Sequence, residues 1–209
     1  MEAETVYLFV FTTMADWEPS FAIAGINNPR FQREPGRYRV ATVGLTTETV
    51  TTMGGVRIQP DTAISAISPA GSAMLILPGG DAWEQGENIE AIVKAAEFLA
   101  AAVPVAAICA ATLALARAGF LDNRIHTSNA PEYLKATGYR GRSLYRNIPA
   151  IADGSLITAS GVAPVDFAYQ IFGMLQLYQD PALDAWYALF KRGDASKYYA
   201  LAGADRQPA

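Results

Sequence analysis

Cysteine and histidine are almost missing from this chain of 209 residues, which contains one of each. A single cysteine excludes an intramolecular disulfide, and the two residues together cannot supply a Cys/His zinc site. The lack of a disulfide pair is typical of a reducing compartment. No G-x-G-x-x-G motif opens a helix after the first apolar run, and no Walker A motif occurs. We therefore expect neither a metal nor a cofactor.

Charged residues and long apolar runs are also scarce. Charged side chains make up 17% of the chain, with 16 basic against 20 acidic residues, which excludes a basic surface for a nucleic-acid backbone. No stretch reaches the roughly 20 consecutive apolar residues that span a bilayer. The acidic start MEAETVYLFVF is unlike a secretory signal. We expect a cytoplasmic protein with no nucleic-acid and no membrane partner.

Apolar residues are abundant, at 51% of the chain, which is enough for a stable core. Short apolar runs bounded by turn residues predict buried parallel strands at residues 6–11, 39–43, 73–77 and 103–108. Helical spacing, and Pro164 as a helix-starting residue, predict helices at residues 89–99, 113–120 and 165–178. This alternation predicts an α/β fold, with a mostly parallel sheet and helices on both faces.

Three further segments complete the predicted organisation. Gly54–Gly55 within residues 46–58 and Asp153–Gly154 within residues 148–159 predict two hairpins. Residues 180–209 form an aromatic helical tail that either caps the domain or supports a dimer contact. Because there is no repeat or shift in composition, we expect residues 1–209 to form one domain.

Cys109 is the first candidate for chemistry, since it lies between a predicted strand and a helical segment. A side chain at such a turn projects from the carboxyl edge of the sheet, where open α/β proteins bind ligands. The amino end of the following helix would favour a thiolate there. The alternative is a buried cysteine that acts as a small apolar residue, and spacing alone favours neither interpretation.

Gly79 and Gly80 follow another predicted strand, and their amides, together with that of Ala110, can form an oxyanion hole beside Cys109. The glycine pair taken alone favours an ordinary turn. Glu18 follows the first predicted strand. A structural role, in which the Glu18 carboxylate stabilises the start of a helix, is sufficient to account for this residue. The alternative hypothesis places Glu18 beside the Cys109 sulfur, where it carries a proton.

His126 is the only imidazole, so any Cys–His pair must use it, although an isolated histidine is more often structural. Several other residues fall near the same predicted rim. Candidate pocket-lining residues are Trp17, Asp81, Trp83, Asn129 and Tyr133. For the aromatic members, ordinary packing is the more common role.

Five segments taken together resemble the ThiJ/PfpI family. They are ADWE (15–18), LPGGD (77–81), AAICAA (106–111), LARAGFL (115–121) and TASGVAPVDF (158–167), and the match runs in order over residues 6–178. The resemblance implies the class I glutamine amidotransferase-like superfamily, with a flavodoxin-like three-layer sandwich and a nucleophile elbow. It also implies a homodimer.

The resemblance assigns roles position by position. Cys109 matches the reactive elbow cysteine, and Glu18 matches the acid that bonds to its sulfur. Gly79, Gly80 and Ala110 match the backbone on the oxyanion side. One departure matters, because the peptidase and amidotransferase branches place a histidine directly after the cysteine, where this chain has Ala110. A Cys–His–Glu triad built on that position is excluded.

Three functions compete at this point. The first is a cofactor-independent cysteine enzyme, of amidase/hydrolase or glyoxalase-like type, acting on a small electrophilic substrate. The second is a non-enzymatic oxidation-sensing stress protein or chaperone that uses the same cysteine. The third is an inert scaffold with a structural thiol. We rank them in this order, with little separation between the first two.

Overall fold

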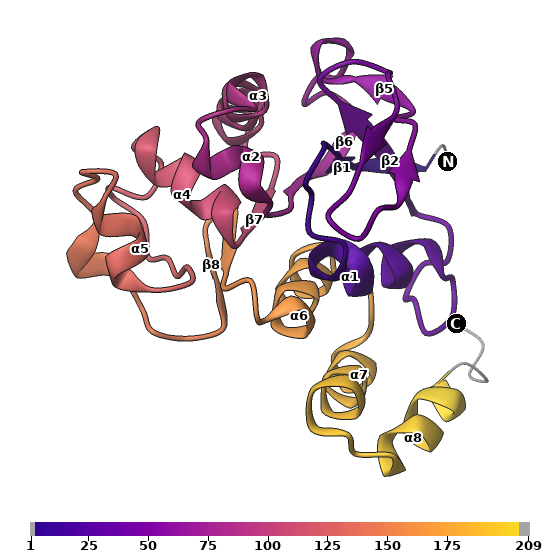
Figure 1. Ribbon diagram of the computed structural model, residues 1–209. Helices are drawn as coiled ribbons and strands as arrows, with labels where there is room; N and C mark the ends of the chain where they lie inside the picture. Colours follow the sequence, from indigo (N-terminus) through magenta and orange to yellow (C-terminus); the bar gives the residue numbers. More distant parts are fainter. Residues whose placement is uncertain (1–2, 205–209) are drawn as a thin grey trace.

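The computed structural model describes residues 3–204, and a seven-stranded sheet lies at its centre (Figure 1). The strand order is β5-β2-β1-β6-β7-β9-β8, and all neighbouring strands run parallel except β8 and β9. The strands of the sheet are β1 (Glu4–Phe9), β2 (Tyr38–Gly44), β5 (Thr62–Ala63), β6 (Ser72–Leu77), β7 (Val105–Ile108), β8 (Ala150–Asp153) and β9 (Leu156–Ala159).

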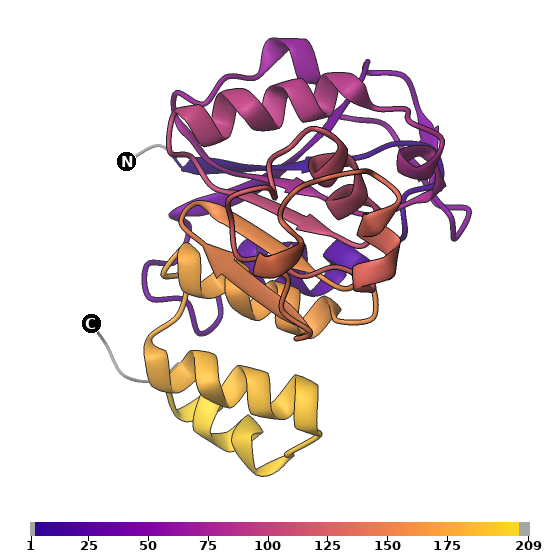
Figure 2. The same cartoon turned by 90° about the vertical axis from the view of Figure 1, so that its left-hand side faces the viewer.

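Helices cover both faces of this sheet (Figure 2). On one face lie α1 (Trp17–Asn27) and α6 (Pro164–Met174). The other face carries α3 (Ile89–Ala100) and α4 (Ala110–Arg117), with α2 (Asp81–Glu84) and α5 (Pro131–Lys135) beside α4. Short 3-10 turns occur at Ile64–Ala66 and Arg142–Leu144. The arrangement is a flavodoxin-like three-layer sandwich, which confirms the predicted fold class.

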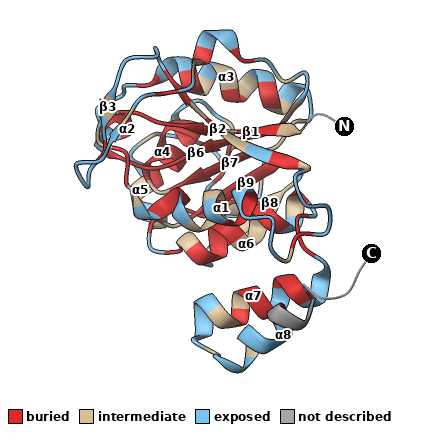
Figure 3. Cartoon of the chain, turned by 90° about the vertical axis from the view of Figure 1, so that its right-hand side faces the viewer, coloured by how far each residue is buried: buried red, intermediate tan, exposed pale blue. Residues whose placement is uncertain are grey.

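The central strands are buried on both faces, as parallel strands covered by helices must be (Figure 3). Leu75, Ile76 and Ile108 are fully buried. Each such side chain contributes about 1.5–3 kcal/mol to folding through removal of apolar surface from water. The core therefore fixes the strand ends on which the candidate site is built.

Both predicted hairpins are present. The antiparallel pair β3 (Val50–Thr51) and β4 (Arg57–Ile58) encloses the Gly54–Gly55 turn, and β8 pairs with β9 across Asp153–Gly154. The helical segment expected directly after Cys109 is α4, which begins at Ala110, whereas apolar spacing alone placed the start of this helix at residue 113. Its first turn consists of alanine and threonine, so the apolar spacing on which the prediction relied starts only at Leu113.

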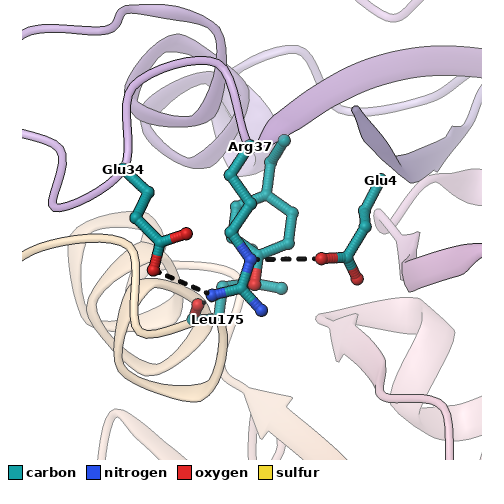
Figure 4. Close-up of polar contacts among 5 residues, drawn as sticks. Glu4, Glu34, Arg37 and Leu175 are labelled. Carbon is teal, nitrogen blue, oxygen red and sulfur yellow. Dashed lines mark hydrogen bonds and ion pairs between the residues drawn. The ribbon is translucent and has the colours of Figure 1, made fainter. Parts of the chain in front are cut away.

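At the amino end of the sheet, Arg37 joins the starts of two strands (Figure 4). Its Nε donates to Glu4 Oε1 at 3.1 Å, and its Nη1 lies 3.6 Å from Glu34 Oε1. The neighbouring Tyr38 donates its hydroxyl proton to the carbonyl of Leu175 at 2.9 Å. These contacts lie at the opposite end of the strands from Cys109, so they support the fold rather than the site.

The tail forms α7 (Asp180–Arg192) and α8 (Ser196–Ala204), and residues 205–209 lie outside the described part. Helix α7 packs against α6 and α1 through Trp186, whose ring contacts Phe21 and Phe172 (Figures 1 and 2). The tail therefore caps the layer formed by α1 and α6. Within residues 3–204, no helix has both the length and the apolar character needed to cross a bilayer.

Candidate active site around Cys109

Cys109 lies at the turn between β7 and α4, with φ 57° and ψ −125°. A residue with a side chain rarely adopts this conformation, which costs on the order of 1–3 kcal/mol. Neighbouring hydrogen bonds hold it: the Cys109 amide donates to the Ala159 carbonyl at 3.0 Å, and the Thr112 hydroxyl donates to the Cys109 carbonyl at 2.6 Å. The result is a nucleophile elbow that presents a half-buried thiol at the carboxyl edge of the sheet.

Glu18 reaches the same point from the first turn of α1 and is 1% exposed. The Gly79 amide donates to Glu18 Oε2 at 2.5 Å, and the carboxyl group is hydrogen-bonded to the Cys109 thiol. The Glu18 carboxyl therefore lies beside the Cys109 thiol, as the hypothesis of a proton carrier predicts.

Two glycines leave room for this pair. A methyl group added at Gly161 would lie 2.7 Å from Cys109 Sγ and 3.1 Å from Glu18 Oε1. A methyl group at Gly79 would lie 2.7 Å from Cys109 Cβ and 2.8 Å from Glu18 Oε2. Real Cβ atoms do not approach other heavy atoms this closely, so only glycine fits at either position without a shift of the site.

The electrostatics of the pair follow from its burial. Burial raises the pKa of Glu18 from 4.5 to about 7, against the opposing effect of the Gly79 and Cys109 hydrogen bonds. Burial and, second, the Glu18 charge raise the pKa of the Cys109 thiol to about 12. This raised pKa corrects the expectation that the amino end of α4 favours a thiolate at Cys109. The Ala110 amide does lower the thiol pKa, but burial and the neighbouring carboxylate outweigh it.

The charge on Glu18 decides how easily the thiol ionises. A protonated Glu18 removes the repulsion and can donate its own proton to the sulfur. Proton loss from the thiol and proton uptake by the carboxylate are therefore one coupled event, and the two groups titrate as a pair.

Asn129 is the third polar side chain at the sulfur. Its Nδ2 donates to Cys109 Sγ at 3.2 Å, and its Oδ1 accepts from the Gly161 amide at 2.8 Å. The Gly161 bond fixes the orientation of the amide group, because only the oxygen can accept it. Trp17 is half exposed and donates its indole N–H to the Gly161 carbonyl at 3.3 Å. Asn129 and Trp17 both lie at the rim of the site, as predicted from the sequence.

The amides predicted as oxyanion donors differ in their hydrogen bonding. The Gly79 amide is occupied by Glu18, so its assignment as an oxyanion donor is corrected. Gly80 has φ +155°, and a methyl group there would lie 2.5 Å from the Thr13 carbonyl oxygen. Among the described residues, the Gly80 amide makes no hydrogen bond with a protein acceptor. The Ala110 amide is hydrogen-bonded to Cys109, and the assignment of Gly80 and Ala110 as oxyanion donors stays a prediction.

His126 is not brought to Cys109, which corrects its assignment as a candidate catalytic residue. The side chain is fully buried, with Nδ1 2.7 Å from the Arg124 carbonyl and Nε2 3.0 Å from the Tyr139 hydroxyl. Because a carbonyl only accepts, Nδ1 carries the proton and Nε2 accepts from the tyrosine. Burial also lowers the pKa of His126, so the ring is a neutral structural group.

The other three rim candidates, Trp83, Asp81 and Tyr133, make no hydrogen bond to the Cys109 sulfur in the described part of the chain. Trp83 is fully buried against Phe9 and Phe11 and donates its indole N–H to the Pro78 carbonyl at 2.7 Å, so it is a core residue. Asp81 is exposed at the start of α2. Tyr133 is half-buried on α5 and donates to Glu84 Oε1 at 2.7 Å.

No role was predicted from the sequence for Gly161, Thr112 or Glu84. The signal for Gly161 was its place after β9, at the same strand-end rim as Cys109. Nothing in the sequence pairs Tyr133 with Glu84, because these residues meet only through tertiary packing. Within residues 3–204, no group of three His, Cys, Asp or Glu side chains is arranged to hold a metal ion.

Comparisons with known proteins show similarity to one family. A profile of the DJ-1/PfpI family matches residues 4–174. The uncharacterized protease YoaZ of Bacillus subtilis is 37% identical over 204 residues, which cover 96% of this chain and 97% of that protein. The uncharacterized protease YdeA of the same organism is 34% identical over 166 residues, which cover 77% of this chain and 78% of that protein.

Solved structures show the same similarity. A ThiJ/PfpI family protein from Bacillus anthracis is 37% identical, with a TM-score of 0.88 and 98% of each chain covered. A DJ-1 superfamily protein from Agrobacterium tumefaciens is 34% identical, with a TM-score of 0.80, and the match covers 90% of this chain and 98% of that one. The range matched by the family profile, residues 4–174, includes Glu18, Cys109 and Asn129.

Proposed function

The chain belongs to the DJ-1/PfpI family, and we propose that it is a cysteine enzyme in which the Cys109 sulfur attacks a small electrophilic carbon while Glu18 carries the proton. One observation supports this most directly: a carboxyl whose pKa is raised to about 7 is hydrogen-bonded to the thiol at a nucleophile elbow. A group with a pKa near neutrality can both take and return a proton.

The reaction with a carbonyl compound follows from this arrangement. The Glu18 carboxylate accepts the thiol proton as the sulfur forms a bond to the carbonyl carbon, and the π-electron pair moves onto the carbonyl oxygen. The Gly80 and Ala110 amides stabilise the developing oxyanion. Glu18 then returns the proton to that oxygen, which gives a neutral hemithioacetal from thiol and carbonyl. Asn129 holds the sulfur by donating to it throughout.

Hydrolysis of peptides fits these residues less well, although two relatives are named uncharacterized proteases. An amine leaving group needs a proton donor, and His126 is held in its own hydrogen bonds. Position 110 is alanine. Within residues 3–204, Glu18 is then the only acidic side chain hydrogen-bonded to the thiol, and addition to a reactive carbonyl needs no other acid–base group.

A substrate panel tests the proposal. Wild type, Cys109→Ser and Glu18→Gln are compared on dicarbonyls, small amides and isonitriles. We expect turnover by the wild type, none by Cys109→Ser, and about a hundredfold loss in Glu18→Gln, the usual contribution of one acid–base group. Glu90→Gln, the same substitution at an exposed position on α3, is the control. Equal background rates for all four proteins on every compound would overturn the proposal.

Oxidation sensing is the second candidate, favoured by the half-buried thiol beside a carboxyl. Two molecules of hydrogen peroxide would convert the thiol to a sulfinic acid and leave two molecules of water, and Glu18 would bond to the product. Mass spectrometry after mild peroxide treatment checks this function. It predicts a two-oxygen adduct at Cys109 that forms more slowly in Glu18→Gln, whereas no selective adduct would rule it out.

A further inference from the structure

A cavity of about 330 Å³ adjoins the residues that contact the thiol. Asn129, which donates to Cys109 Sγ at 3.2 Å, forms part of its wall. Ser160 and Val162, on either side of the Gly161 that packs against the sulfur, form another part. The volume is at the lower end of the range for small-molecule sites. The cavity can therefore hold a small ligand beside the residues that surround the sulfur.

Lys191 reaches the same cavity from the tail of the chain. It lies in the last turn of α7, which packs against α6 (Figure 1), and beyond residues 4–174, the range that the family profile matches. Its ammonium group donates to Asp166 Oδ2 at 2.6 Å, and its side chain is 36% exposed. The buried Asp166 also accepts from the Tyr187 hydroxyl at 2.8 Å. Asp166 therefore anchors the lysine through one of its three N–H groups, and the others can serve a ligand.

The polar residues on the cavity wall favour an anion. Besides Lys191, the wall includes Ser160 and Asn147, which add a hydroxyl and an amide that can donate hydrogen bonds to a ligand. Among the described residues that line the cavity there is no aspartate or glutamate. A ligand here therefore meets one positive charge and neutral donors, with no carboxylate on the wall to repel it.

The single positive charge indicates which kind of anion fits. Lys191 is the one charged residue that the described structure places on the cavity wall, and Asp166 compensates part of its charge. A phosphate dianion would leave more negative charge unmatched in this cavity. A carboxylate carries one negative charge on two oxygens, so the lysine can bind one oxygen while a neutral donor such as Ser160 binds the other.

We propose that this cavity holds a carboxylate group of the substrate and that Lys191 binds it. The inference rests on the proposed function, because it concerns the compound that the Cys109 sulfur attacks. It narrows the substrate class to small oxo acids, whose carbonyl carbon lies at the thiol while the carboxylate lies in the cavity. Lys191 is a binding residue in this scheme, and Glu18 is still the proton carrier.

Matched anionic and neutral alkylating reagents test the preference, and the single cysteine makes each of them report on Cys109. Iodoacetate and iodoacetamide form one pair of nearly equal size. N-iodoacetylglycine and N-iodoacetylglycinamide form a second pair, in which the carboxylate stands farther from the reacting carbon. Comparing the anion-to-neutral rate ratio between protein variants cancels the intrinsic reactivity of the reagents. We expect Lys191→Gln to lower this ratio by about three- to tenfold in at least one pair, the range for one hydrogen bond.

Two further variants separate binding from the general effect of charge. Arg192→Gln removes the next positive charge on α7, which lies over the Tyr187 ring at 5.9 Å and does not line the cavity, so the ratio should change little. Asp166→Asn removes the compensating charge but keeps an oxygen for Tyr187, so the ratio should rise. A fall in Lys191→Gln that is no greater than that in Arg192→Gln, for both pairs of reagents, would overturn the inference. If Lys191→Gln does not fold, Asp166→Asn decides, and an unchanged ratio there would overturn it.

The neutral reagents distinguish this failure from failure of the proposed function. Their rates report access to the thiol and its activation, with no contribution from a carboxylate. If Cys109 reacts readily with both neutral reagents but the ratio does not respond to Lys191, the inference is wrong and the proposed function stands. If Cys109 reacts with none of the four reagents until the protein unfolds, the proposed function fails, and with it the inference.

Discussion

The buried carboxyl of Glu18 links the chemistry of the site to the stability of the fold. A carboxyl whose pKa is higher in the folded than in the unfolded state binds more protons when folded. Its contribution to stability is therefore greatest below pH 4.5, the unfolded value, and is lost as the pH rises through the folded value of about 7. A shift of this size corresponds to roughly 3 kcal/mol.

Glu18→Gln should therefore stabilise the protein at high pH. Glutamine resembles the protonated acid, with an oxygen for the Gly79 amide and an NH₂ group for the sulfur. We expect the free energy of unfolding of the variant to exceed that of wild type by up to about 3 kcal/mol at pH 8, with the difference vanishing below pH 4.5. Urea unfolding across pH checks this. A difference that does not change with pH would contradict the burial of an ionised group.

Gly161 gives a steric test at the same site. Alanine there would place a methyl group 2.7 Å from Cys109 Sγ, so we expect a loss of about 1–3 kcal/mol in unfolding free energy and slower alkylation of the thiol. The matched control is Gly173→Ala in α6, where the nearest atom is 3.9 Å away. That variant should be neutral or slightly stabilised. Equal effects of the two substitutions would show that space beside the sulfur is not limiting.

The sequence indicated some of these residue roles and missed others. Glu18 and Cys109 each follow a strand, and because the carboxyl ends of parallel strands meet at one edge, their meeting was predictable. The residues next to a side chain in the sequence do not reveal which groups it contacts in the fold. His126 was assigned to the thiol because it is the only imidazole, while Tyr139 and the Arg124 carbonyl determine what it does. The raised thiol pKa depends on burial, which spacing does not reveal.

At the scale of elements, the site is assembled from four chain segments at strand ends and a fifth, before α5, that carries Asn129. The first four carry Glu18 after β1, Gly79 after β6, Cys109 after β7 and Gly161 after β9. Four central strands were predicted because they are continuous apolar runs. The two-residue strand β5 was not predicted, since so short a segment has no periodicity to detect.

The β3–β4 hairpin supports the segment that leads to Glu18. Asp16 accepts from the Thr52 hydroxyl at 2.5 Å and from the Gly54 amide at 2.6 Å. We expect Asp16→Ala to lower the unfolding free energy by about 1–3 kcal/mol, because both donors lose their partner, and to slow alkylation of Cys109 because Glu18 is held less firmly.

Asp61→Ala is the matched control for the hairpin. The Asp61 carboxylate accepts two bonds from Thr42, each 2.7 Å long, where β2 meets the segment before β5. Its loss should affect stability without changing the reactivity of the thiol. If both variants slow alkylation equally, the effect is general loosening of the fold, and the hairpin has no specific role in placing Glu18.

At the scale of the whole molecule, the homodimer implied by the family resemblance stays a prediction. Two exposed apolar side chains lie at the site rim: Trp17 is 52% exposed and Val162 is 88% exposed. Such side chains are candidates for a subunit contact. We expect sedimentation velocity to give twice the chain mass, and Val162→Glu to shift the protein toward monomer. Val93→Glu, on α3, is the control. A wild type that is monomeric at every concentration would contradict the dimer.

The pH dependence of Cys109 alkylation tests most directly whether the thiol and Glu18 share a proton, and the single cysteine makes every modified molecule informative. In wild type we expect the rate to rise through about pH 7, as Glu18 loses its proton, and then to level off. In Glu18→Gln that step should disappear, and the rate should climb until above pH 9, the ordinary thiol value, because the thiol is buried. Superimposable profiles, or a single wild-type step near pH 9, would contradict the shared proton on which the proposed chemistry depends.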